Sequence, residues 1–217
     1  TYCKNFIFIS SDKAVRPTNI MGASKRFSEI MIQNMSKNSD LKTVFSIVRF
    51  GNVFRSTGSV IPLFDQQISN GGPITVTDPN ATRYFMSISE AAKLVLYACQ
   101  ISKGGEVFVL NMGEPLNILK IAEKMIKLSG NTVKNNQNPK GEIEIKFTGL
   151  KDGEKLHEEL LIGDNLITTD NSDILIANET FPSETLINNV LTKLNENLDY
   201  NSEEYLTKII FDCIEKK

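Results

Sequence analysis

A strand, a loop, a helix and a second strand follow one another near the start of the chain, and this order constrains the fold more than any other feature. The apolar run Phe6-Ile7-Phe8-Ile9 is typical of a strand that is buried on both faces. Apolar residues recur every three or four positions from Ile20 to Met35, which predicts a helix. The β-branched and aromatic stretch at 43–50 predicts the second strand. Such a unit implies a parallel sheet, so we expect an α/β protein.

The elements expected after residue 53 are shorter and are separated by Gly and Pro. They are a helix at 61–69, a strand at 74–77, a helix at 91–99 that Ser87 and Glu90 cap, a strand at 106–111, a helix that Asn117 caps and Gly130 ends, and a half-buried strand at 142–148. Weaker patterns indicate a short helix at 156–162 and a helical stretch from about 183 to 217.

The composition argues against several classes of function. Positive and negative side chains are interspersed, 24 against 26, whereas a general nucleic-acid binder needs a strongly basic patch. The three cysteines are far apart and form no CxxC pair, so we expect neither a disulfide framework nor a metal site. No apolar run approaches the roughly 20 residues of a membrane span, and the first residues do not resemble a secretory signal. We therefore expect no nucleic-acid partner and no membrane contact from this segment.

The chain starts at Thr1 and enters its first strand within five residues. Because a protein seldom begins inside its own core, we expect these residues to be the carboxyl-terminal part of a longer protein.

Two neighbouring polar residues, Asp12 and Lys13, follow the first strand, where open α/β sheets place their ligands. Met21 and Lys25 are four residues apart and therefore share one face of the next helix. An acid and an amine in one pocket could donate and accept protons if their pKa values approach neutrality. The simpler interpretation is a solvated loop pair, with Met21 in the core and Lys25 on the surface.

Residues 6–26 closely resemble the catalytic segment of the extended short-chain dehydrogenase/reductases that act on nucleotide sugars. The nearest group is the CapD/WbpM-like UDP-N-acetylglucosamine 4,6-dehydratases of polysaccharide biosynthesis. That group has an acid-lysine pair and, nine residues after the acid, the first position of a Tyr-xxx-Lys motif. Asp12 matches the acid and Lys25 the motif's lysine, but Met21 stands in place of Tyr. A Met here resembles the large membrane-bound branch of the group.

Four further stretches resemble the family's substrate-binding motifs, in the family's order. Arg49-Phe50-Gly51-Asn52-Val53 resembles a strand-end motif whose Asn contacts the diphosphate, and 58–64, with Ser59 and Val60, resembles a segment that borders the uridine. Thr82-Arg83-Tyr84-Phe85-Met86 resembles a stretch whose Arg pairs with the diphosphate.

The fourth stretch, 149–156, resembles a Gly-Leu-Arg-Pro-Gly-Glu-Lys-Leu motif whose Arg reaches the phosphates and whose Glu, here Glu154, accepts from the ribose hydroxyls. Two positions depart from it, because Lys151 replaces Arg and Asp152 replaces Pro. Lysine keeps the charge but loses the bidentate fork, so we expect looser diphosphate binding at this position.

The resemblance implies a mechanism and a role for each residue. A tightly held NAD, or NADP, takes a hydride from sugar C4, water is eliminated across C5 and C6, and the hydride returns to C6. Lys13 would take the C5 proton and Asp12 would protonate the departing C6 hydroxyl. Lys25, with Ser10 and Phe50, would bind the cofactor. Because Met21 offers no phenol, Ser11 or a water molecule would relay the C4 hydroxyl proton.

The resemblance also implies the organisation of the chain. We expect a partial Rossmann-type parallel sheet, its second half only, with a smaller α/β substrate-binding domain. The expected domains are 1–55, to which helix 87–100 returns, then 56–165 for the nucleotide sugar, then a helical extension at 166–217. No Gly-xx-Gly-xx-Gly loop is present, so a missing amino-terminal half would bind most of the NAD.

The implied partner is a UDP-N-acetylhexosamine, and the implied setting is cytoplasmic, at the membrane face in a full-length parent that forms homo-oligomers. Two alternatives stay open. One is a UDP-sugar C4-epimerase, and the other is a truncated, non-catalytic UDP-sugar-binding remnant. The only histidine, His157, is expected to be structural.

Overall fold

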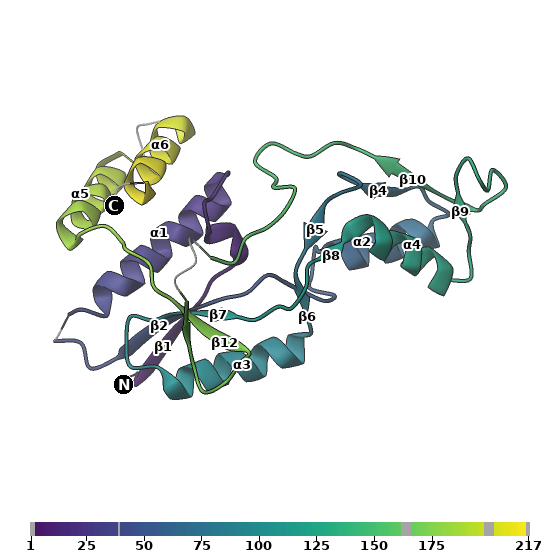
Figure 1. Ribbon diagram of the computed structural model, residues 1–217. Coiled ribbons are helices and arrows are strands. Elements are labelled where there is room, and N and C mark those ends of the chain that lie inside the picture. The colour runs from purple at the N-terminus through teal and green to yellow at the C-terminus, as the bar shows by residue number, and fades with distance from the viewer. Residues whose placement is uncertain (1–2, 39, 162–165, 198–201, 216–217) are drawn as a thin grey trace. The chain divides into compact units, whose positions relative to one another are not determined.

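The computed structural model describes residues 3–38, 40–161, 166–197 and 202–215. The chain divides into two compact units (Figure 1). Unit 1 contains Thr1–Phe50, Ala92–Asn111 and Glu159–Lys217, and unit 2 contains Gly51–Ala91 and Met112–Glu158. These units divide the chain at other positions than the three domains expected from the sequence.

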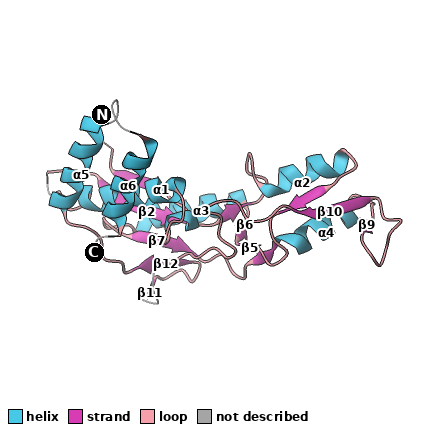
Figure 2. Ribbon diagram, turned by 90° about the horizontal axis from the view of Figure 1, so that it is seen from above, coloured by secondary structure: helices cyan, strands magenta, loops and turns pink. Residues whose placement is uncertain are grey.

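Unit 1 is built on a mixed sheet in which the described strands follow the order β1-β2-β7-β12-β11. The last four of these strands are labelled in Figure 2. The strands β1 (Asn5–Ile9), β2 (Val44–Arg49) and β7 (Val107–Leu110) are parallel, which confirms the expected α/β class. The strands β12 (Ile174–Ala177) and β11 (Leu166–Thr168) continue the sheet in antiparallel pairing.

Two expectations about this sheet are wrong. The first strand is not buried on both faces, because β1 lies at the edge and Phe6 and Ile9 are each 42% exposed. The stretch from residue 166 is not purely helical, because β11 and β12 precede its helices. The continuous apolar run Ile174-Leu175-Ile176 fits the position of β12 between β7 and β11.

Three helices of unit 1 pack against one another. Asn19 caps α1 (Ile20–Met35) by accepting a hydrogen bond from Gly22 N at 2.9 Å. The carboxyl-terminal helices α5 (Glu184–Asn197) and α6 (Glu203–Ile214) lie against α1 (Figure 1). The residues that fill this contact are Phe27, Met31, Leu186, Val190, Leu191, Leu194, Ile209, Ile210, Cys213 and Ile214.

Unit 2 contains three small groups of paired strands and two helices. The strands β4 (Ile74–Val76), β10 (Ile143–Phe147) and β9 (Val133–Lys134) form one sheet. β3 (Asn52–Val53) pairs with β6 (Phe85–Met86), and β5 (Thr82–Arg83) pairs with β8 (Leu116–Asn117). The helices α2 (Val60–Ser69) and α4 (Ile118–Leu128) bury Ile61, Phe64, Ala122 and Ile126 in the core of this unit.

Local signals placed the helices of this part well. Asn117 caps α4 by accepting from Lys120 N at 2.9 Å, and Ser87 Oγ accepts from Glu90 N at 3.1 Å at the start of α3 (Ile88–Ile101). The expected helix at 156–162 is wrong over 156–161, and residue 162 lies outside the described residues. Thr82 N donates to Leu156 O at 3.1 Å, so this segment pairs with β5 instead of coiling.

A cluster of four buried charges joins α1, β2 and the segment after β12 in unit 1. The Arg49 guanidinium donates to both carboxylate oxygens of Glu29, each at 2.7 Å, and to both oxygens of Glu179, at 2.5 and 2.9 Å. Arg26 Nη1 lies 3.0 Å from Glu29 Oε2 and from Glu179 Oε2. Arg49 and Glu29 are fully buried. The two positive and two negative charges therefore compensate one another directly.

The pKa directions fit this arrangement. Burial alone would raise the pKa of Glu29, but the hydrogen bonds and charges of Arg49 and Arg26 outweigh it and hold that pKa below its ordinary value. Burial likewise acts to lower the pKa of Arg49, while Glu29 and Glu179 raise it above its ordinary value. Glu29 and Arg49 are therefore both charged at neutral pH.

Removing one member of this cluster leaves an uncompensated buried charge. We expect Arg49→Met to lower the free energy of unfolding of unit 1 by about 3–5 kcal/mol, measured by denaturant titration. Arg16→Met is the control, because the ion pair of Arg16 with Glu159 is exposed and worth about 1 kcal/mol or less. Equal losses in the two variants would contradict this account.

Acid should weaken the same cluster. Because the pKa of Glu29 is lower in the folded than in the unfolded chain, its contribution is present above the ordinary glutamate pKa and is lost as the pH falls through the folded-state value. The double variant Glu29→Met/Arg49→Met keeps the Arg26–Glu179 pair. We expect it to lose less stability than the wild type between pH 7 and pH 3, and parallel stability curves would contradict this.

Candidate functional site

The carboxyl ends of β1 and β2 position the acid-lysine pair in unit 1. Beyond β1, Ser10 N donates to Val48 O at 2.8 Å, and Asp12 N donates to Phe50 O at 3.3 Å. The chain then turns in a short 3-10 helix, η1 (Asp12–Ala14), whose first turn is capped by the Ser11 hydroxyl, 3.2 Å from Lys13 N. The sequence therefore correctly located Asp12 and Lys13 just past the first parallel strand.

Asp12 and Lys13 form an ion pair that is closed to solvent on the acid's side. Lys13 Nζ and Ser11 Oγ each lie 2.8 Å from Asp12 Oδ1. Asp12 is fully buried, whereas the Lys13 side chain is 32% exposed. The other oxygen, Asp12 Oδ2, is buried and accepts no hydrogen bond from the described residues. A solvated loop pair does not fit this burial.

The predicted residues of α1 lie on its exposed side. Lys25 Nζ donates to Ile9 O at 3.2 Å and lies 4.9 Å from the centre of the Phe8 ring, so it reaches the end of β1. Met21 is 47% exposed, so it is not a core residue. The carboxyl end of β1 thus gathers Ser10, Ser11, Asp12, Lys13 and Lys25.

Gly22 allows η1 to lie directly on α1. A Cβ atom at this position would lie 2.2 Å from the Lys13 carbonyl oxygen and 3.0 Å from Pro17 Cβ. Because a backbone oxygen cannot yield to it as a flexible side chain would, only glycine fits without moving the turn that carries Lys13.

The candidate diphosphate ligand in unit 2, Arg83, is already engaged within the protein. Its Nη1 donates to Thr82 O at 2.8 Å and to Leu156 O at 3.1 Å, and its Nη2 donates to Glu154 Oε1 at 2.9 Å. The Arg83 side chain is only 11% exposed, and a second carboxylate oxygen, Glu158 Oε1, lies 3.9 Å from its Nε.

The candidate ribose ligand, Glu154, accepts from two other groups. Thr77 Oγ1 donates to Glu154 Oε1 at 3.0 Å, and Lys151 N donates to Glu154 Oε2 at 3.2 Å. The structure therefore brings Arg83, Glu154 and the Lys151 backbone together, while Lys151 itself is exposed. The sequence analysis did not indicate Thr77 or Glu158. Thr77 directly follows β4 and Glu158 lies two residues beyond the 149–156 motif, and these positions are the only features that could have pointed to them.

The remaining candidates lie on neighbouring elements of unit 2. Asn52 N donates to Tyr84 O at 3.0 Å, which sets β3 beside the residue that follows Arg83. Asn52 Oδ1 and Ser59 Oγ are buried and have no hydrogen-bond partner among the described residues. Ser59 stands at the cap position of α2 and Val60 is its first residue. The two unpartnered oxygens leave polar groups available to a ligand.

A separate hollow of about 610 Å³ lies between α2 and α4. The lining of this hollow includes Phe54, Arg55, Leu116 and Leu128, but none of the predicted substrate residues.

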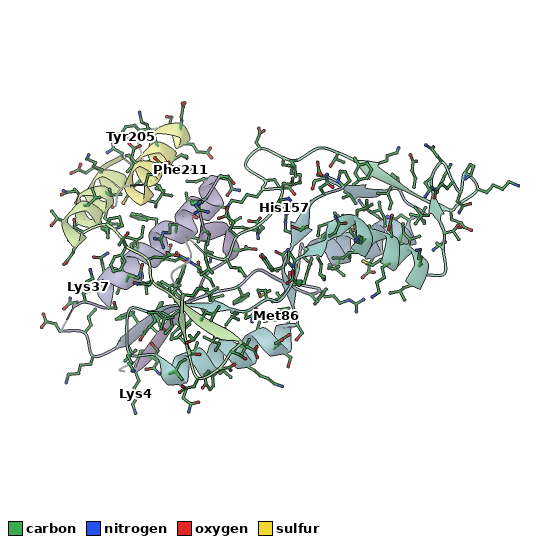
Figure 3. All side chains as sticks on the ribbon, in the orientation of Figure 1. Lys4, Lys37, Met86, His157, Tyr205 and Phe211 are labelled. Carbon is green, nitrogen blue, oxygen red and sulfur yellow. The ribbon has the colours of Figure 1, made fainter. Side chains whose placement is uncertain are left out.

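The histidine His157 (labelled in Figure 3) places its Nδ1 2.9 Å from Thr82 Oγ1, so it joins its segment to β5. Within the described residues, no group of three or more His, Cys, Asp or Glu is placed to hold a metal ion.

A family model described as "Polysaccharide biosynthesis protein" matches residues 1–195. The chain belongs to this family. It is 53% identical over 156 residues to the capsular polysaccharide biosynthesis protein CapD of Staphylococcus aureus, covering 72% of this chain and 25% of that protein. It is 37% identical over 165 residues to a UDP-glucose 4-epimerase of Rickettsia rickettsii, covering 76% of this chain and 45% of that protein. The expected family is confirmed, and the chain spans about a quarter of the length of its CapD relative.

Solved structures show the same fold. Pen from Bacillus thuringiensis aligns with a TM-score of 0.69 at 36% identity, covering 87% of this chain and 62% of that one. DesIV, a dTDP-glucose 4,6-dehydratase from Streptomyces venezuelae solved with NAD and TYD bound, aligns with a TM-score of 0.61 at 16% identity, covering 72% and 51%. The second likeness concerns the fold alone. In the described parts of the chain, no helix has the length and apolar character to cross a membrane.

The close approach at Gly22 predicts the sign of the change in stability that Gly22→Ala causes. Helix propensity alone would make Gly22→Ala stabilising by about 1 kcal/mol. Because the new methyl would meet the Lys13 carbonyl, we expect destabilisation by about 1–3 kcal/mol instead, measured by denaturant unfolding. Ser24→Ala, at an exposed position of the same helix, is the control and should change stability little. A stabilised Gly22→Ala variant would refute the contact.

Proposed function

We propose that the chain is the catalytic and substrate-binding part of a UDP-N-acetylglucosamine 4,6-dehydratase that makes a precursor for polysaccharide or glycan synthesis. The observation that carries the proposal is the buried Asp12–Lys13 pair with its unpartnered Asp12 Oδ2. A C5 base and a C6 acid are what water elimination requires, and an epimerase needs neither. Membership of the polysaccharide biosynthesis family supports it.

The ion pair supplies both catalytic forms by one proton shift. At 2.8 Å, the proton that Lys13 Nζ shares with Asp12 can pass to the carboxylate. The shift leaves an amine that can take the C5 proton and a carboxylic acid that can protonate the departing C6 hydroxyl. Because Asp12 is fully buried and Ser11 Oγ lies 2.8 Å from its Oδ1, we assign Ser11 the task of carrying the acid's proton to the sugar.

The residues at the end of β1 fit the cofactor of the family. Lys25 has three N–H donors and the Ile9 carbonyl takes one, so two can bind ribose hydroxyls. Ser10 and Phe50 would flank it. When bound, NAD supplies the acceptor for the C4 hydride, and the positive charge of Lys25 favours that oxidation. Because Met21 has no acidic hydrogen, the C4 hydroxyl proton leaves through Ser11 or water.

Unit 2 would hold the nucleotide. Arg83 and Lys151 would bind the diphosphate and Glu154 the ribose hydroxyls, with Asn52, Ser59 and Val60 completing the contacts. The unpartnered Asn52 Oδ1 and Ser59 Oγ support this assignment. Self-association and a cytoplasmic setting of the whole protein stay predictions.

A second candidate function is a UDP-sugar C4-epimerase, which the rickettsial relative favours. The two differ in their products, because only the dehydratase releases water. A UDP-4-keto-6-deoxy sugar would establish dehydration, and a C4 epimer of the substrate would establish the alternative.

Replacing either member of the pair should abolish elimination. In the full-length enzyme, with NAD and UDP-N-acetylglucosamine, we expect Lys13→Met and Asp12→Asn each to slow formation of the 4-keto-6-deoxy product by about 10²–10⁴-fold, followed by mass spectrometry. Binding of the UDP-sugar should not change.

Lys208→Met and Asp212→Asn on α6 are matched controls, because both residues are exposed. Normal turnover in both Lys13→Met and Asp12→Asn would sink the assignment. Sugar binding by the wild type without any turnover would favour the non-catalytic remnant.

A further inference from the structure

The residues assigned to the diphosphate and to the ribose are bonded to each other in unit 2. Arg83 Nη2 donates to Glu154 Oε1 at 2.9 Å, and their side chains are 11% and 23% exposed. A phosphate that approaches Arg83 therefore meets a charged acceptor already in place. The inference below rests on the proposed roles of these two residues.

Hydrogen-bond capacity decides what a ribose can do at Glu154. Each carboxylate oxygen has two lone pairs. Oε1 already accepts from Arg83 Nη2 and Thr77 Oγ1, whereas Oε2 accepts from Lys151 N. A vicinal diol that donates one hydrogen bond to each oxygen can use the free position on Oε2, but it must displace a donor from Oε1.

Arg83 can lose Glu154 without losing its own position. Its Nη1 donates to the carbonyls of Thr82 and Leu156, and neither bond involves Glu154. A diol that replaces Nη2 on Oε1 would therefore release an N–H of a guanidinium that stays fixed. Without the diol, Arg83 lies within 4 Å of the carboxyl oxygens of Glu154 and Glu158, which compete with an incoming anion for the guanidinium.

We propose that the Arg83–Glu154 pair is a latch that the ribose opens, so that unit 2 binds a ribonucleoside diphosphate in preference to inorganic pyrophosphate. Ribose hydroxyls occupy Glu154, and the freed Arg83 donor then binds the diphosphate. The two halves of the nucleotide consequently favour each other's binding, by a coupling that acts equally in both directions.

Positive coupling between two small probes tests the latch in the wild-type chain. Pyrophosphate is titrated calorimetrically with and without saturating uridine. We expect uridine to strengthen pyrophosphate binding by about fivefold or more, and 2′-deoxyuridine to do so less because it lacks one hydroxyl. Unchanged or weaker pyrophosphate binding in the presence of uridine would overturn the proposal.

Glu154→Gln removes the competing charge at nearly constant shape. In this variant we expect pyrophosphate alone to bind as tightly as it binds the wild type with uridine, and the coupling to disappear. Glu144→Gln is the matched control, because Glu144 is an exposed glutamate of the same unit, on β10, and should leave the coupling unchanged.

The proposed function and the latch fail in different ways. If the wild type binds neither UDP nor uridine, the proposed nucleotide site is wrong and the latch fails with it. If UDP binds but Glu154→Gln gives pyrophosphate no advantage, the latch is wrong and the nucleotide site stands.

Discussion

The buried pairing of Arg49 with Glu29 and Glu179 is the contact on which unit 1 depends. It joins the last residue of β2 to the middle of α1 and to the chain beyond β12, and Arg26 completes it from the position next to Lys25. Charges closed to water tolerate little displacement, because a lost partner leaves a desolvation cost of several kcal/mol. The rotation of α1, and with it the position of Lys25 at the end of β1, is therefore held by this cluster.

Local patterns predicted most elements, and non-local contacts account for the failures. The spacing of apolar residues placed α1, and Asn117 and Ser87 placed the starts of α4 and α3. The segment at 156–161 has a helical pattern but bonds to β5, and β1 has a core composition but lies at an edge. The helix or strand propensity of a segment does not depend on which distant residues the segment will contact in the fold. The same reason explains why the sequence missed the Arg26–Glu179 and Arg83–Glu154 pairs.

The candidate residues gain their chemistry from burial as much as from identity. Asp12 and Lys13 are adjacent in sequence, a pattern that is common on solvated loops, and the motif alone does not reveal that Asp12 is closed to water. In unit 2, Arg83 has the positive charge that a diphosphate would bind, but its N–H groups already donate to acceptors within the protein. In both units, the sequence predicted the type of a group, whereas its hydrogen-bond partners and burial come from the fold.

The separation of Arg49 and Glu179 by 130 residues has a consequence for synthesis of the chain. Unit 1 is assembled from three stretches of sequence, and both pieces of unit 2 lie before the last stretch. Until Glu179 leaves the ribosome, Arg26 and Arg49 of a growing chain have only one carboxylate of this cluster as a partner, that of Glu29. Unit 2 can complete its core during that interval, whereas unit 1 closes last, after its longest loop. Arg26 and Arg49 are thus made long before Glu179, the residue that completes their cluster.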